Sequence, residues 1–132
     1  MKRFLLLLTL LMLVGCGKQT AEQHGEGISI EIGDIEGMNY LELMTYVNGG
    51  PFGGTIDFEK INNEEYYELG DIIWFNVQVI QSNNRQEIEV LYSDHRGGRN
   101  AIATNRVDIS SANKWVNARL TSEFELDVLD FE

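Results

Sequence analysis

The chain has 132 residues, a formal net charge of −11 at pH 7, one cysteine, one proline and 13 glycines. The length suits a single domain, and a content of 43% hydrophobic and 23% charged residues excludes a disordered or collagen-like chain. The acidic balance argues against nucleic-acid binding, which depends on Lys and Arg facing phosphates, and a single cysteine cannot form a disulfide within the chain.

The first sixteen residues have the layout of an export signal. Lys2 and Arg3 precede an apolar run over 4–14, and Gly15 and Cys16 follow it. A helix needs roughly 20 apolar residues to cross a bilayer, so this run is too short to be a membrane span. The layout is typical of a secretory signal peptide.

The segment Leu13-Val14-Gly15-Cys16 resembles the lipobox of bacterial prolipoproteins. In that family the signal peptidase cleaves before a cysteine that carries diacylglycerol. The resemblance implies a cleaved signal peptide over 1–15 and lipidation of Cys16, which would anchor the protein at the extracytoplasmic face of the cell membrane or outer membrane. Gly17 stands where an Asp tends to retain Gram-negative lipoproteins at the inner membrane, so its presence mildly favours the outer one. The alternative is an ordinary signal peptide with an incidental cysteine.

Polar residues over 16–27 show no apolar periodicity and predict a flexible tether behind the lipidated cysteine. We therefore expect one folded domain over 28–132. In its first part, alternating apolar residues predict strands over 28–32, 40–47 and 55–59.

The strongest strand pattern covers 68–80, where alternate residues from Ile73 to Val79 share an apolar face. With the polar turn over 81–86 and the alternation over 88–92, it predicts a hairpin. Because large apolar residues stand on both sides of the first strand, we expect it to be covered on both faces.

A second turn over 94–100 leads into a strand over 101–109, and a last strand begins near 124. Residues 115–120 fit a strand, which we favour, but they also fit one face of a helix capped by Ser110 or Ser111.

Seven or eight short strands predict an all-β fold, an antiparallel β-sandwich whose core includes bulky aromatic residues. These expected core residues are Trp74, Phe75, Tyr92 and Trp115. Residues 67–71 and the long strand after them resemble the immunoglobulin-like modules of bacterial surface proteins. That resemblance implies a sandwich and no particular function.

Motifs of common enzymes, such as GxSxG, HExxH and GxxxxGK[ST], do not occur in the sequence. His24 and His95 offer no zinc-ligand spacing, and residues 34–39 lack the spacing of an EF-hand. Carboxylates number 21 and are too abundant to mark a catalytic pair. We expect no metal and no cofactor, and binding rather than catalysis.

Two segments are candidates for binding. The glycine-rich segment over 48–54 predicts a hairpin loop, in which Phe52 either packs back onto the sheet or is presented to a partner. Residues 94–121 carry five basic and two acidic residues. They either balance neighbouring acidic strands or form a cationic patch, with Arg96 and Arg99 at the tip of a turn.

The sequence therefore predicts a membrane-anchored lipoprotein that acts as a binding or accessory module of an envelope complex. Its expected partner is a protein of the cell envelope. The alternatives are a small envelope hydrolase with a carboxylate site, and an inhibitor or adhesin that presents the 48–54 loop.

Overall fold

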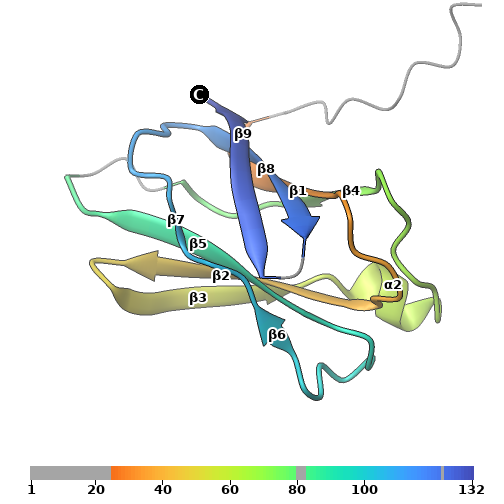
Figure 1. Ribbon diagram of the computed structural model, residues 1–132. Coiled ribbons are helices and arrows are strands. Elements are labelled where there is room, and N and C mark those ends of the chain that lie inside the picture. The colour runs from red at the N-terminus through yellow and green to blue at the C-terminus, as the bar shows by residue number, and fades with distance from the viewer. Residues whose placement is uncertain (1–24, 80–82, 123) are drawn as a thin grey trace, which may run out of the picture.

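The computed structural model describes residues 25–79, 83–122 and 124–132, which form two packed β-sheets whose strands cross in Figure 1. One sheet has the order β4-β1-β8-β9, and the other has the order β3-β2-β5-β6, with β7 also paired to β5. The elements are β1 (Gly27–Ile32), β2 (Tyr40–Val47), β3 (Gly50–Ile56), α2 (Phe58–Asn62), β4 (Ile72–Phe75), β5 (Gln86–Ser93), β6 (Ile102–Ala103), β7 (Val107–Asp108), β8 (Trp115–Ser122) and β9 (Glu125–Phe131).

The predicted all-β sandwich is confirmed, although one of its sheets is mixed because β1 and β8 run parallel. The signal peptide over 1–15, Cys16 and the part of the tether before Gly25 lie outside the described residues. No helix in the described ranges is long and apolar enough to span a membrane.

The core lies between the sheets and is built from the alternate residues of their strands. Ile28, Ile30 and Ile32 of β1 are fully buried, and so are the β8 residues beside them. The opposite sheet supplies the buried apolar side chains of β2 and β5. Burial of each large side chain contributes about 1.5–3 kcal/mol, so the inward residues of the period-two pattern strongly stabilise the sandwich.

β1 begins at Gly27, one residue earlier than expected, because Gly27 already pairs with Trp115 of β8. This position has no room for a side chain. A Cβ atom there would lie 2.7 Å from the carbonyl oxygen of Phe75 and would meet the ring of Trp74. The folded domain therefore includes the last residue assigned to the tether.

The predicted hairpin between 68–80 and 88–92 is wrong. Only Ile72–Phe75 form a strand, which pairs with β1, whereas β5 belongs to the other sheet. The strand ends where the Val77 amide donates a hydrogen bond to the Phe75 carbonyl at 2.9 Å. Covering on both faces is also wrong, since Ile72 is 37% exposed on the outer face.

Two other segments differ from the expected strands. Residues 55–59 close β3 and then turn into α2, because the Asp57 side chain accepts a hydrogen bond from the Glu59 amide and caps the helix. Residues 101–109 form the two short strands β6 and β7, between which the Thr104 amide donates to the Val90 carbonyl at 2.9 Å.

The strand interpretation of 115–120 is confirmed by β8. Of the expected bulky core residues, Phe75 and Tyr92 are buried, whereas Trp74 and Trp115 are only partly buried. Each tryptophan is one residue away from an inward-facing neighbour, so the strand alternation turns it to the outer face.

Candidate functional site

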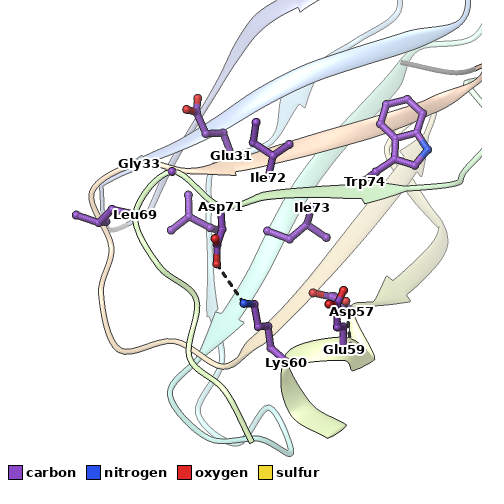
Figure 2. A pocket seen from close by; sticks show the side chains of 12 residues that line it. Glu31, Gly33, Asp57, Glu59, Lys60, Leu69, Asp71, Ile72, Ile73 and Trp74 are labelled. Atoms are coloured by element: carbon purple, nitrogen blue, oxygen red, sulfur yellow. Dashed lines mark hydrogen bonds and ion pairs between the residues drawn. The ribbon is translucent and has the colours of Figure 1, made fainter. Parts of the chain in front are cut away.

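An open groove of about 970 Å³ lies between α2 and the sheet edge at β4 (Figure 2). Asp57, Glu59 and Lys60 line it from the helix side. Ile73 and Trp74 line it from β4, and further residues come from the end of β1 and the turn before β4. The groove therefore has charged groups on both sides, including Glu31 and Asp71 from the sheet side, and apolar groups along β4.

Tyr67 holds the helix wall in place. Its ring is 3% exposed and packs in the core, and its hydroxyl donates to the Asp57 carboxylate at 2.6 Å. Its amide also donates to the Met38 carbonyl at 2.7 Å. A five-residue helix is not stable by itself, so these contacts and the Asp57 cap keep α2 beside the groove.

Four carboxylates and one ammonium group line the groove, which makes it acidic. The Lys60 ammonium lies 3.3 Å from Asp71 and 3.6 Å from Glu65. Burial lowers the pKa of Lys60, but the hydrogen bond and charge of Asp71, with those of Glu65, outweigh it and raise that pKa above its ordinary value. Glu59 has no cationic partner among the described residues.

The pKa of Tyr67 predicts a loss of stability in alkali. Burial, with the hydrogen bond and charge of Asp57, raises this pKa, and burial with the hydrogen bond to Glu42 raises the pKa of Tyr40 to about 12. In the unfolded chain, tyrosine hydroxyls have a pKa of about 10. The folded state therefore holds more protons above that pH, and the free energy of unfolding should fall as pH rises.

Urea unfolding between about pH 8 and 11 measures this fall, and we expect it to be shallower in Tyr67→Phe. Tyr66→Phe removes a phenol that is 57% exposed and is the control. An identical fall in wild type and Tyr67→Phe would contradict the prediction.

The segment expected to be a loop over 48–54 is largely a strand. Asn48 and Gly49 have positive φ values of 51° and 81° and make the turn, and β3 then runs along the sheet edge from Gly50. The β2–β3 register pairs Thr45 with Gly53 and Tyr46 with Pro51, which leaves Phe52 as a bulge. Phe52 does not pack back onto the sheet, since it is 67% exposed.

Arg96 and Arg99 lie in the turn after β5, as expected. Arg96 forms an ion pair with Glu64, just beyond α2, at 2.9 Å. The turn is held by Gly98, whose φ is 71° and which packs against the ring of Tyr40. Arg99 has no ion-pair partner in the part of the chain that the structure describes.

Phe52 and the two arginines are not brought together. The Gly50 end of β3 and the start of β5 lie at the same end of the sheet, because Val47 of β2 pairs with both Gly50 and Gln86. The arginine turn follows the opposite end of β5 (Figure 1). The eight residues of β5 lie between these two ends of the sheet, a length of about 27 Å.

The remaining bases of the 94–121 stretch pair with carboxylates of neighbouring segments. Arg119 lies 2.6 Å from Glu31, and Lys114 lies 3.2 Å from Glu132. Arg106 lies 3.7 Å from Glu89 and stacks 3.6 Å from the centre of the Tyr46 ring. These contacts favour charge balance as the role of most of the stretch.

Sequence reasoning missed the groove, because its two sides come from segments that were predicted as strands over 55–59 and 68–80. The structure forms α2 and the short strand β4 there instead. The one available signal of α2 was Asp57, which is a favoured helix N-cap residue and is followed by no proline over 58–62. The described residues hold no group of three or more His, Cys, Asp or Glu that could bind a metal ion.

Comparisons with known proteins found no matching family model, no matching curated protein and no matching solved structure. The resemblances to the lipobox and to immunoglobulin-like modules therefore stay predictions.

Proposed function

We propose that this chain is a lipid-anchored bacterial lipoprotein of the cell envelope that binds a protein partner through the groove between α2 and β4. The observation that carries the proposal is the groove itself. It is open and acidic, and apolar side chains of β4 line it beside the carboxylates; such mixed lining is typical of binding sites.

The chain enters the domain close to the Trp74 end of the groove, because Gly27 lies against the Trp74 ring. The Gly27 amide donates to the Lys114 carbonyl, and Lys114 in turn contacts the chain's last residue, so the chain enters the domain beside its C-terminus. In Figure 1 this point lies at the opposite side of the domain from α2 and the arginine turn.

Binding is favoured over hydrolysis because most carboxylates of the groove already have partners. Asp71 pairs with Lys60, Asp57 accepts from Tyr67, and Glu31 pairs with Arg119. A general acid or base must instead be free to exchange a proton with a substrate.

A photo-crosslinking residue at position 69 tests the proposal in a bacterial host. Leu69 lines the groove and is 52% exposed, whereas Leu129 on β9 is 47% exposed at the other sheet edge and serves as the control. We expect one discrete protein adduct from position 69 and none from position 129. Adducts of equal yield from both positions, or from neither, would contradict a groove-bound partner.

The arginine turn lies beyond the far end of α2, and we expect it to contact the same partner. Exposed ion pairs contribute about 0–1 kcal/mol, so Arg96→Glu with Arg99→Glu should leave the melting temperature nearly unchanged. The double change should weaken partner capture at least tenfold, which is about 1.4 kcal/mol, and added salt should weaken wild-type capture.

Capture by the purified double variant, followed against salt concentration, measures this effect. A variant that melts clearly lower and still captures the partner would assign these arginines to the fold. The exposed Phe52 on β3 would then be the better candidate.

A further inference from the structure

β4 is an edge strand with one open side. Among the described residues it pairs only with β1, in antiparallel register. The Ile32 amide donates to the Asp71 carbonyl at 2.8 Å, so the backbone at Asp71 faces β1. Backbone groups alternate between the two sides of an antiparallel strand. Those of Ile72 and Trp74 therefore face away from β1, and each residue offers one N–H and one carbonyl along the groove.

The two faces beside this open edge differ in chemistry (Figure 2). The side chains of Ile72 and Trp74 lie on the outer face of β4. Ile73 lies on the face toward α2, where Asp57 and Glu59 stand across the groove. A strand added to this edge would place alternate side chains beside the apolar pair and beside the carboxylates.

We propose, resting on the binding function above, that the groove takes an extended segment of the partner protein in which Lys or Arg alternates with apolar residues. The segment adds to the open edge of β4 as a further strand. Main-chain hydrogen bonds to Ile72 and Trp74 hold it, and its basic side chains face Asp57 and Glu59. The edge supplies affinity for any extended chain, and the carboxylates select the basic one.

The first test uses the full chain in a nonionic detergent and a fluorescent seven-residue peptide of alternating lysine and valine. Fluorescence anisotropy should show saturable binding to wild type and none for the matched glutamate–valine peptide. Glu59→Lys should weaken binding at least tenfold. The control Glu125→Lys makes the same charge change on β9, at the opposite sheet edge, and should weaken binding less than twofold.

The second test asks whether the strand edge takes part. Methylation of alternate backbone nitrogens keeps the charge of the lysine–valine peptide but removes its N–H donors, and we expect at least a tenfold loss of binding. Equal binding of the methylated and unmethylated peptides, or equal weakening by the two protein variants, would show simple charge attraction and overturn the proposal.

The peptide tests can fail separately from the proposed function. If neither peptide binds while the adduct at position 69 still forms, the basic-strand proposal is wrong and the groove-bound partner stands. If the adduct is missing as well, both proposals fail.

Discussion

Phe75→Ala is expected to lower the free energy of unfolding by about 3–5 kcal/mol, the usual cost of deleting a buried aromatic side chain. Phe75 is 3% exposed and belongs to the core cluster between the sheets. A domain of this size has a total stability of about 5–15 kcal/mol, so the variant should lose a large share of it. Urea unfolding followed by circular dichroism measures the change.

Ile72→Ala is the matched control, because this residue lies on the same strand but is 37% exposed on the outer face. Its expected cost is below about 1 kcal/mol. Both variants should be made in a chain that starts at Gly25, because a chain that starts at residue 28 would lack the buried Gly27 of β1. Equal costs for the two variants would mean that Phe75 is not part of the core.

Cys16→Ser is expected to abolish membrane retention completely. If Cys16 carries diacylglycerol, each buried CH₂ contributes about 0.8 kcal/mol to anchoring, and a serine cannot receive the thioether-linked lipid. Wild-type protein should incorporate labelled palmitate and partition into the detergent phase, and the variant should do neither. Gly17→Ala, next to the cysteine, is the control that should keep both properties. Wild-type protein that stays soluble and unlabelled would contradict the lipoprotein proposal.

The side-chain alternation in the sequence assigned the buried face of β1 but not that of β4, where Trp74 was wrongly expected in the core. It identified Ile28, Ile30 and Ile32 of β1 as one apolar face and Phe75 as a core residue, and these side chains are buried. It could not assign strand partners, since every strand offers a similar apolar face. β4 pairs with β1 rather than with the next strand in the chain, and only the packed sandwich decides this.

Glycine content misled the interpretation of β3. Glycines weaken strands in isolation, so the segment around Phe52 suggested a loop. The pairing with β2 accommodates them, and at Gly54 the ends of the Glu42 and Met44 side chains fill the space of a Cβ atom, 2.6 and 2.7 Å from its position. The packing of neighbouring side chains therefore outweighs the low intrinsic preference.

The groove was beyond sequence reasoning for a related reason. α2 has five residues, too few for a helical repeat to stand out, and it forms only with its Asp57 cap and the Tyr67 hydroxyl in place. The candidate arginines were found at a turn as expected, because Gly97 and Gly98 mark it directly in the sequence.

The parallel pairing of β1 with β8 bears on the order in which the domain can assemble. Ser29 in β1 hydrogen-bonds to Asn117 in β8, and 88 positions separate the two residues. Such distant contacts slow folding, typically to roughly milliseconds or seconds for all-β domains. The first strand to emerge during synthesis cannot complete its sheet until almost the whole chain has followed. Such late folding would be compatible with the export that the proposed lipoprotein requires.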